Sequence, residues 1–461
     1  MPEPLSLTPE EMRRLGYAVV DRLVEHVERR DEEPPLRVGD PDDLLATVGG
    51  PPPDAPGDPD AELAALFEQV LPWGQRADHR RFFARIGSPS TYVGVLADAA
   101  AAGVNAFTGS WTGGSGPSAV ELTVLDWLRG WCGMPHGTEG VLTSGGSIAS
   151  LVGFAAAREA RLGGPRGTGT VYVSDQTHAS LPRAVALMGE RTRVLHSDGA
   201  QRLRPDVLRA AVAEDREAGL DPFCVVATAG TTSTGAVDPL RELRAVCDEH
   251  GLWLHVDGAY GAPAALTEQG AAALDGLGLA DSLAIDPHKW LFQPYEIGAV
   301  LVREPGLLER VFSLEGAYLR DTHGGAVSFR DRGPELTRGA RGLKLWLSVR
   351  TFGLDAFRAA IAHGIALAEH AEAQLRARDG WEVVTAAQLA IVTFRRVGLD
   401  DAAHTRLSAA MVEDGYAAPS TTVVGGRVVL RLCTINPRTT FEEIDATLDR
   451  MEALSPDGLG G

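Results

Sequence analysis

Lys289 is the residue whose type and setting most directly indicate covalent chemistry in this sequence. It lies in the segment DPHKW at 286–290, directly after a short apolar run, and lysine occurs at only two of the 461 positions, 289 and 344. Burial among apolar neighbours is expected to lower the pKa of a lysine and to make its amine a nucleophile. A solvated surface lysine is the ordinary alternative, but a chain that otherwise uses arginine indicates a task that arginine cannot perform. We therefore predict that Lys289 forms a Schiff base.

Asp257 is a second candidate, because it ends the apolar run LWLHVD at 252–257. A carboxylate at the end of a buried strand costs free energy unless a cation faces it. A protonated pyridine nitrogen would be such a cation, but a metal ion or the start of a helix would suit the carboxylate equally well. The run by itself leaves these alternatives open.

Gly145, Gly146 and Ser147 form a candidate phosphate site between a strand-like run and an alanine-rich helical stretch. Free backbone N–H groups at such a helix start bind phosphate together with the helix dipole, and the Ser147 hydroxyl would add a donor. Glycines at strand-to-helix turns also serve purely steric needs. The turn therefore needs support from other residues.

Alternating elements are expected to position these three features. Between about residues 90 and 350, longer helical stretches separate six β-branched runs, at 140–143, 170–174, 224–228, 252–257, 281–285 and 297–303. This alternation predicts an α/β fold with a mostly parallel sheet covered on both faces. Ligands of such folds bind beyond the carboxyl ends of the strands, so the polar residues that follow the runs are expected to meet.

Three segments are expected along the chain. Residues 1–90 form an N-terminal helical arm and linker, which opens with a capping box at 8–11. Within it, residues 31–60 hold eight prolines and four glycines and are expected to be an extended connection that contacts another subunit. Residues 91–350 form the large domain. A smaller α+β domain at 351–461 is expected to contain helices near 354–376 and 441–454 and strands near 389–395 and 428–432.

Composition argues against several classes of partner. The formal charge is −19, from 43 basic and 62 acidic residues, which disfavours nucleic acids and anionic membranes. The four cysteines form no C-x-x-C pair, which argues against a disulfide framework and a structural zinc site. No run approaches the roughly 20 apolar residues of a membrane span. The N-terminus lacks the pattern of a secretory signal. His178, His255 and His288 lie on separate strands, so no metal site is predicted. We expect a cytoplasmic protein.

Five motifs in series resemble the group II pyridoxal-phosphate-dependent decarboxylases, in particular the aromatic-L-amino-acid decarboxylases. They are TSGGS at 143–147, SDQTHAS at 174–180, ATAGTT at 227–232, HVDGAY at 255–260 and PHKW at 287–290. The resemblance extends from the N-terminal helix to about residue 450. It implies the fold of type I pyridoxal-phosphate-dependent transferases, a homodimer with shared active sites, and pyridoxal 5′-phosphate bound to Lys289 as an internal aldimine.

The resemblance also implies a role for each matched residue. Asp257 would pair with the pyridinium nitrogen, Ala259 would pack under the ring, and His178 would stack above it, with Thr232 beside the cofactor. The phosphate would be held by Gly146, Ser147 and His288, with Gly145 in the same turn. The protein's task is then to orient the bond on Cα that breaks. The implied reaction converts an L-amino acid, aromatic or otherwise bulky, to CO2 and an amine.

Phe329 departs from the family pattern. Counting back fifteen residues from Lys344 places it where the family's mobile loop carries a tyrosine that returns a proton to Cα. Relatives with phenylalanine there react with dioxygen and release an aldehyde, ammonia and hydrogen peroxide, so oxidative deamination is an alternative. In simple decarboxylation His178, Tyr318, His323 or water would supply the proton. The candidate catalytic residues are thus Lys289, His178, Asp257 and Phe329.

The expected substrate pocket departs from the pattern as well. Arg85 stands where the aromatic decarboxylases carry an aromatic residue, whereas Phe107 and Trp111 remain near the expected pocket. An aromatic substrate is thus predicted, while Arg85 could instead meet an acidic side chain or pair with a surface carboxylate. Asp286 replaces the asparagine of many relatives, and a carboxylate there would repel the phosphate unless it turns to a cation.

Two other classes of protein are weaker alternatives. An aminotransferase or a carbon–sulfur lyase could use the same fold, but the His-Lys-Trp context at 288–290 is similar to that of the decarboxylases. A non-catalytic relative would have lost its cofactor residues, whereas Lys289 and Asp257 are both present. We therefore predict a carboxy-lyase.

Overall fold

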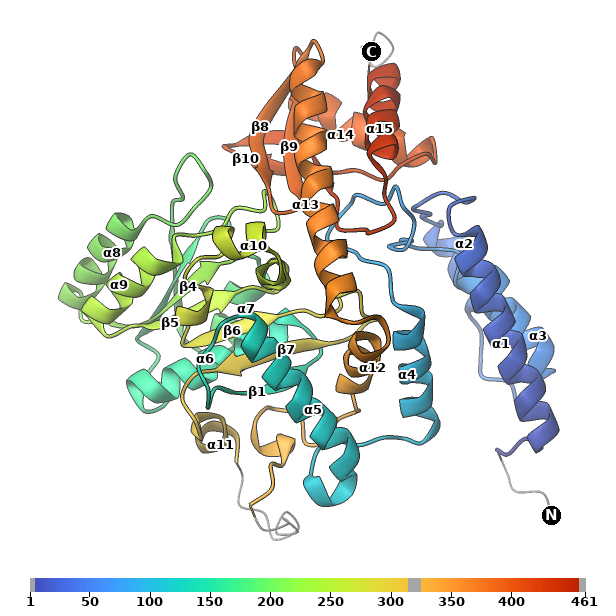
Figure 1. Cartoon of the computed structure of the whole chain (residues 1–461), viewed down its shortest axis with the longest axis horizontal. Helices are drawn as coiled ribbons and strands as arrows, with labels where there is room; N and C mark the ends of the chain where they lie inside the picture. The colour runs from blue at the N-terminus through green and yellow to red at the C-terminus, as the bar shows by residue number, and fades with distance from the viewer. Residues whose placement is uncertain (1–4, 314–324, 456–461) are drawn as a thin grey trace.

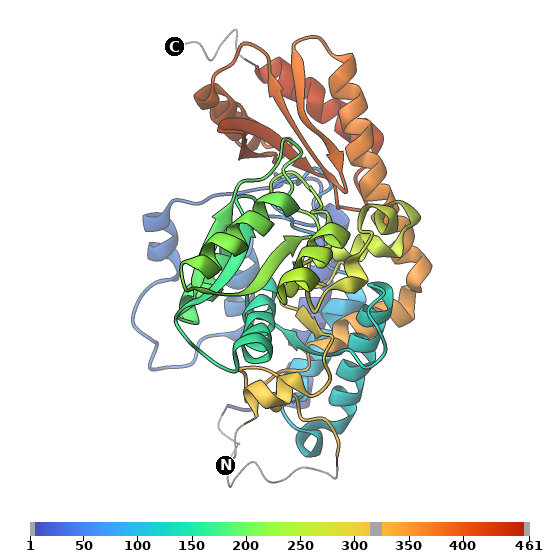
Figure 2. The ribbon, with the colours of Figure 1, turned by 90° about the vertical axis from the view of Figure 1, so that its left-hand side faces the viewer.

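The computed structural model describes residues 5–313 and 325–455, which form two β-sheets with flanking helices (Figures 1 and 2). The larger sheet has the strand order β1-β7-β6-β5-β4-β2-β3. The pairs β2–β3, β2–β4, β4–β5 and β5–β6 are parallel, and β7 runs antiparallel to both of its neighbours. The predicted α/β fold with a mostly parallel sheet is confirmed. The strands are β1 (Glu139–Thr143), β2 (Gly169–Ser174), β3 (Arg191–Leu195), β4 (Asp221–Thr228), β5 (Trp253–Asp257), β6 (Ser282–Ile285) and β7 (Gly298–Val302).

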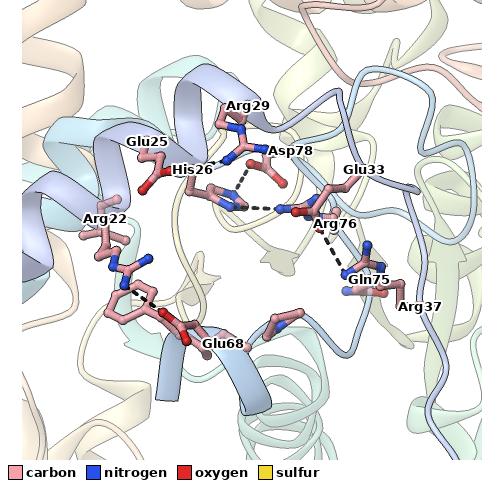
Figure 3. Close-up of a pocket in the computed structure, with 14 residues that line it drawn as sticks. Arg22, Glu25, His26, Arg29, Glu33, Arg37, Glu68, Gln75, Arg76 and Asp78 are labelled. Carbon is pink, nitrogen blue, oxygen red and sulfur yellow. Dashed lines mark hydrogen bonds and ion pairs between the residues drawn. The ribbon is translucent and has the colours of Figure 1, made fainter. Parts of the chain in front are cut away.

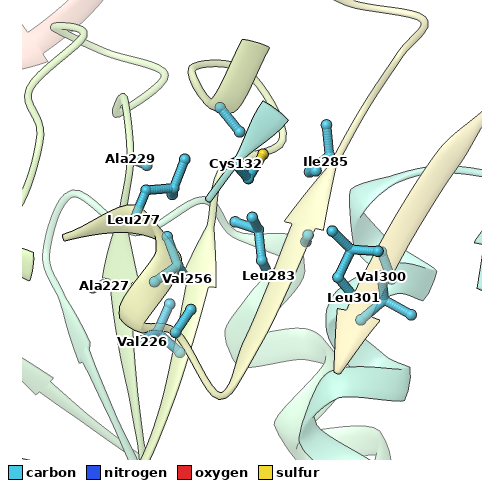
Figure 4. Close-up of a cluster of buried hydrophobic side chains, with 14 of the residues drawn as sticks. Cys132, Val226, Ala227, Ala229, Val256, Leu277, Leu283, Ile285, Val300 and Leu301 are labelled. Atoms are coloured by element: carbon cyan, nitrogen blue, oxygen red, sulfur yellow. The ribbon is translucent and has the colours of Figure 1, made fainter. Parts of the chain in front are cut away.

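Apolar runs without alternation form the centre of this sheet. β5, β6 and β7 are buried along their whole length, as expected for strands covered on both faces. Figure 4 shows Val226, Val256, Leu283 and Val300, which β4, β5, β6 and β7 contribute in turn to the core. The edge strand β3 was not predicted, because its exposed and half-buried residues include two arginines. A packed centre holds the strand ends in place.

Helices pack against the large sheet, α6 against β4 to β7 and both α8 and α9 against β4. These helices supply the cover that the continuous apolar strands require. Helical elements of this part are α4 (Tyr92–Gly103), α5 (Trp111–Trp131), α6 (Gly146–Leu162), α7 (Ser180–Leu187), α8 (Pro205–Glu217), α9 (Leu240–His250), η2 (Ala262–Leu266), α10 (Glu268–Ala273), η3 (Leu277–Leu279), α11 (Leu307–Phe312), η5 (Phe329–Asp331) and α12 (Gly342–Phe352). No helix among the described residues is long and apolar enough to cross a membrane.

The C-terminal part contains a four-stranded antiparallel sheet of order β10-β11-β9-β8. Its elements are α13 (Leu354–Ala377), β8 (Trp381–Gln388), β9 (Ile391–Arg396), α14 (Asp401–Glu413), β10 (Ser420–Val424), β11 (Arg427–Cys433) and α15 (Phe441–Leu454). The two expected helices are present, and both expected strands lie within a residue or two of their predicted bounds. β8, α14 and β10 were not predicted. The division at residues 90 and 350 stays a prediction.

Four helical elements form the N-terminal arm, which we define as residues 9–70: α1 (Pro9–Arg29), α2 (Pro41–Val48), α3 (Pro59–Ala65) and the π-helix η1 (Leu66–Val70). The capping box at Thr8 is present. The expectation of an extended connection at 31–60 is wrong, because α2 and the start of α3 lie there. Asp40 and Asp58 cap these helices, and each following proline occupies a first helical position where its missing N–H costs nothing.

Candidate functional site

A cavity of about 360 Å³ opens at the carboxyl ends of β2, β4, β5 and β6. Thr228 and Asp257 are paired across β4 and β5, and Asp257 is paired with Ala284 across β5 and β6. Parallel strands therefore bring the residues that follow them to one edge, as the sequence predicted. All nine predicted cofactor residues line this cavity, namely Gly145, Gly146, Ser147, His178, Thr232, Asp257, Ala259, His288 and Lys289.

Lys289 pairs with Asp286 in this cavity and also interacts with the charge of Asp257. Its Nζ is 3.0 Å from Asp286 Oδ2, and 26% of its side chain is exposed. Burial lowers the pKa of Lys289, but the charges of Asp286 and Asp257 outweigh burial, so the pKa is raised overall. The prediction of a lowered pKa is therefore wrong for this chain, because it considered the apolar neighbours and not the charge of Asp286 three residues away, and because Asp257 is distant in the sequence. Lys289 is an ammonium that must give up a proton before it can act as a nucleophile.

Asp257 is buried at the end of β5. Its Oδ1 accepts a hydrogen bond of 3.1 Å from the Ala259 N–H. Burial raises the pKa of Asp257, while the nearby charge of Lys289 acts in the opposite direction. A cationic ring nitrogen would offset this burial cost. Among the residues that the structure describes, no group of three or more His, Cys, Asp or Glu side chains is placed to hold a metal ion.

The turn before α6 provides backbone donors at 146 and 147, while the Gly145 N–H donates to Thr143 Oγ1 at 3.3 Å. The 17-residue helix begins at Gly146 after Gly145, and no side chain caps it. A Cβ on Gly146 would lie 3.1 Å from both Ala259 Cβ and Asp286 Oδ2, so these neighbours would have to move slightly to admit a side chain there. An uncapped helix start beside a cavity suits a phosphate.

Two histidines border the cavity in defined orientations. His178 Nδ1 lies 2.8 Å from Ser180 Oγ and accepts the Ser180 N–H at 3.3 Å, so its neutral ring carries the proton on Nε2. His288 Nδ1 accepts the Ile297 N–H at 3.2 Å, and burial lowers the pKa of His288. In its neutral form each ring therefore carries its donor proton on Nε2.

Several lining residues were absent from the predicted set. Thr228 Oγ1 and Asp286 Oδ1 are buried without a hydrogen-bond partner. Tyr260 stacks on Trp290 at 5.2 Å, and its hydroxyl accepts the Ala390 N–H. All of them lie at or just after the carboxyl ends of the same strands, and this position in the sequence could have identified them.

Four predicted residues lie away from this cavity in the single chain. Arg85 is exposed and has a φ of 55°, whereas Phe107 and Trp111 are half-buried where α5 begins. Phe329 is fully buried, and the Arg338 guanidinium lies 5.2 Å from the centre of its ring. Their proposed roles stay predictions. The candidate proton donors Tyr318 and His323 lie outside the described residues.

A second cavity, of about 550 Å³, lies between α1, η1 and residues 71–78 (Figure 3). We call it the arm cavity. Its charges are matched: Arg22 pairs with Glu68 at 2.8 Å, and His26 bridges Asp78 and Arg76. Because these groups already satisfy one another, the arm cavity has no unmatched charge for a ligand.

The donor set at the strand ends fits pyridoxal phosphate. The cavity offers an amine for the aldehyde, a buried carboxylate for the ring nitrogen, and an uncapped helix start for the phosphate. Thr228 Oγ1, which has no partner, is a further polar atom available to a ligand. The exception is Asp286, whose charge would face the phosphate.

Comparison with known proteins agrees with this fit. Residues 50–397 match the family described as the pyridoxal-dependent decarboxylase conserved domain. The chain is 42% identical to an aromatic-L-amino-acid decarboxylase of Bacillus atrophaeus, over 99% of this chain and 98% of that one. It is 31% identical to a phenylacetaldehyde synthase of Arabidopsis thaliana, over 94% and 93% of the two chains. The crystal structure of Oryza sativa TDC with PLP and tryptamine superposes with a TM-score of 0.93 at 28% identity, covering 99% of both chains.

Proposed function

The chain belongs to the pyridoxal-dependent decarboxylase family, and from this premise we propose how its own residues perform the reaction and on which substrates. It is a carboxy-lyase that acts on amino acids with pyridoxal 5′-phosphate as cofactor. When bound, this cofactor supplies an electron sink for the electrons left on Cα as CO2 departs. The observation that carries the residue assignment is Lys289 in one cavity with Asp257 and the uncapped α6 turn.

We assign the cofactor contacts to this cavity. Lys289 anchors the cofactor, and Asp257 holds a proton on the ring nitrogen. Backbone N–H groups of 145–147, with the Ser147 and His288 side chains, hold the phosphate. Ala259 and His178 enclose the ring, and Thr232 lies at its edge. The burial of Asp257 supports its assignment, because an anion in a low dielectric gains most from a cationic partner.

His178 is the proposed proton donor to Cα. Its Nδ1 accepts hydrogen bonds from Ser180, which leaves the proton on Nε2. Among the described residues, His178 lines the cavity and Phe329 does not, and Tyr318 and His323 lie outside the described residues. A neutral imidazole N–H suits general-acid catalysis near neutral pH.

We propose that the substrate is an aromatic L-amino acid. The support is the similarity over nearly the whole chain to an aromatic-L-amino-acid decarboxylase and to a structure that contains tryptamine. Arg85, Phe107 and Trp111 are proposed to contact the side chain of the substrate. Since they lie outside the cavity of their own chain, we propose that they act in the site of a second copy.

A homodimer with shared active sites would bring these residues into place. α1 contains no buried residue, and Tyr17, Val20, Val24 and Val27 form one exposed apolar stripe along it. A stripe at helical spacing normally packs against another surface. We propose that this surface belongs to a second copy of this chain. Light scattering should give twice the monomer mass, and Val24→Asp should shift the protein towards monomer. A monomeric wild type would contradict the proposal.

We also propose a cytoplasmic location. All four cysteines are buried as free thiols, and burial raises the pKa of Cys132 and Cys247 to about 12. Such thiols stay protonated and need no oxidising compartment. Fractionation of the source cells would test this location.

Product analysis tests the function directly. The purified, cofactor-loaded protein is incubated with a panel of L-amino acids, with and without dioxygen. We expect CO2 and the corresponding amine in equal amounts from an aromatic substrate, whether or not dioxygen is present. Pyruvate or sulfide as the main product would contradict a decarboxylase.

Oxidative deamination is the second candidate, and Phe329 is the observation that favours it. Phenylalanine cannot donate a proton, and a phenylacetaldehyde synthase is among the relatives. That reaction would convert amino acid, dioxygen and water to aldehyde, CO2, ammonia and hydrogen peroxide. If it operates, Phe329→Tyr should shift the product from aldehyde towards amine. An unchanged product ratio would count against it.

A further inference from the structure

Asp286 carries a charge that the proposed cofactor contacts do not use. The residue is 2% exposed, and its Oδ2 lies 3.0 Å from Lys289 Nζ. Its Oδ1 is buried and has no hydrogen-bond partner. A buried oxygen without a donor costs free energy unless a ligand or water supplies one. One carboxylate oxygen of Asp286, Oδ2, is therefore paired with Lys289, and the other, Oδ1, has no partner.

The Asp286 carboxylate also lies against the turn where α6 begins. A Cβ on Gly146 would be 3.1 Å from Asp286 Oδ2, and a Cβ on Gly145 would be 3.8 Å from Oδ1. No side chain caps α6, so Asp286 supplies negative charge beside the positive end of this helix. Any anion that binds at the turn must share the helix end with this carboxylate.

The other charged groups around Asp286 do not offset the charge of a second anion bound at the α6 turn. Groups that face it or lie across the cavity are Lys289, His288, Asp257, His178 and Tyr295. His288 Nε2 is 3.6 Å from Asp286 Oδ2, but the Ile297 N–H occupies His288 Nδ1, so a second ring proton would break that bond. Asp257 has the same sign as Asp286. Lys289 is therefore the balancing cation among the residues that the structure describes.

Resting on the proposed cofactor site, we propose that Asp286 takes up a proton when the phosphate of the cofactor binds at the α6 turn. The Lys289 nitrogen that bonds to an aldehyde carbon is no longer the free ammonium that pairs with Asp286. A carboxylate beside a phosphate dianion then costs free energy, and protonation removes that cost. Lys289 releases one proton when its nitrogen bonds to the aldehyde carbon, and Asp286, 3.0 Å away, takes up one proton, so the two changes balance. The resulting carboxyl O–H is a donor where asparagine would present an N–H. The contribution of the phosphate to affinity is thereby linked to pH.

Pyridoxal phosphate and pyridoxal are the probes that isolate this effect. Both carry the aldehyde, although free pyridoxal closes to an internal hemiacetal and pyridoxal phosphate does not. This difference is the same for every protein variant, so a change between variants in the ratio of the two dissociation constants reports the phosphate. The cofactor-free full chain is titrated by absorbance near pH 8 and near pH 6, as wild type and as Asp286→Asn. Asp355→Asn is the matched control, because it removes the same charge from a side chain that is 95% exposed.

Asp286→Asn is expected to favour pyridoxal phosphate over pyridoxal about tenfold more strongly than wild type does near pH 8. The difference should shrink near pH 6, and Asp355→Asn should match wild type. Calorimetry of pyridoxal phosphate binding in two buffers of different ionisation enthalpy should show that wild type takes up about one more proton than Asp286→Asn does. Asp286→Ser, which also removes the charge, is expected to show the same pH dependence as Asp286→Asn.

Two results would overturn the proposal. Equal ratios and equal proton uptake in wild type and Asp286→Asn would overturn the role of Asp286 and leave the phosphate site standing. No preference for pyridoxal phosphate over pyridoxal in wild type would overturn the phosphate site itself, and the role of Asp286 with it.

Discussion

The two cavities of this protein differ in how their charges are satisfied. The arm cavity is the larger, at about 550 Å³ against about 360 Å³, yet its charged groups pair with one another near solvent. The cavity around Lys289, which we call the strand-end cavity, holds buried polar atoms without partners and a lysine that interacts with two carboxylates. Unmatched buried groups cost free energy that a ligand can recover. Size is therefore a poorer guide to function than unsatisfied polarity.

Removal of the Lys289 amine should reduce turnover and cofactor absorbance far more than any substitution in the arm cavity. In Lys289→Ala we expect turnover to fall by at least about 10³-fold, together with loss of the visible absorbance of the bound cofactor, because the described residues that line the cavity include no second amine. Arg22→Ala in the arm cavity should retain that absorbance. A Lys289→Ala protein that keeps both absorbance and turnover would refute the assignment.

The charge of Asp257 comes next in expected effect. Asp257→Asn keeps the shape but removes the anion opposite the proposed ring nitrogen, so kcat should fall by about 10³-fold, equivalent to roughly 4 kcal/mol for a lost buried charge partner. Asp78→Asn, which removes a carboxylate from the arm cavity, should leave kcat within about twofold. Steady-state kinetics with saturating cofactor measures both. A kcat of Asp257→Asn close to that of wild type would contradict the pairing.

His255, which lies under the strand-end cavity on β5, should make stability depend on pH. Burial lowers the pKa of His255 to about 3, and its ring nitrogens bond Ser282 and Ser150. The unfolded chain takes up the proton at a higher pH, so the stabilisation is complete above about pH 6.5 and is lost as pH falls towards 3. Between about pH 6.5 and pH 4 the loss should be about 3 kcal/mol.

Urea unfolding of wild type and His255→Gln across this pH range measures the effect. The stability of the variant should vary less with pH, because glutamine does not titrate. His26→Gln is the matched control from the arm cavity, where 39% of the histidine side chain is exposed. If His255→Gln and wild type lose stability in parallel on acidification, the assignment of the effect to His255 is wrong.

The smallest effect is expected from an ion pair of the arm cavity. Arg22 and Glu68 are 2.8 Å apart, but their side chains are 43% and 57% exposed. Glu68→Gln should therefore change the free energy of unfolding by no more than about 0.5 kcal/mol. Chemical denaturation measures this change. A loss above about 2 kcal/mol would show that this ion pair stabilises the fold more than the exposure of its side chains indicates.

Local sequence patterns predicted the parts of the fold that depend on neighbouring residues. The Thr8 capping box, α13, α15 and the buried strands were predictable, because caps and apolar periodicity act within a few residues. α2 and α3 were missed, because prolines at first helical positions count as helix breakers when their aspartate caps are overlooked. β3 and β10 were missed, because their partly exposed residues lack a continuous apolar run.

The amino-acid sequence by itself determined which side chains follow the parallel strands, and therefore which residues gather around Lys289. Strand direction alone brings those positions to one edge of a sheet. Only the tertiary structure decided the charge balance there. The contribution of Asp257 to the raised pKa of Lys289, the unpaired Asp286 Oδ1 and the enclosure of Phe329 against Arg338 depend on distances between segments that packing brings together. Electrostatic energy depends on separation in space, which residue spacing along a chain does not specify.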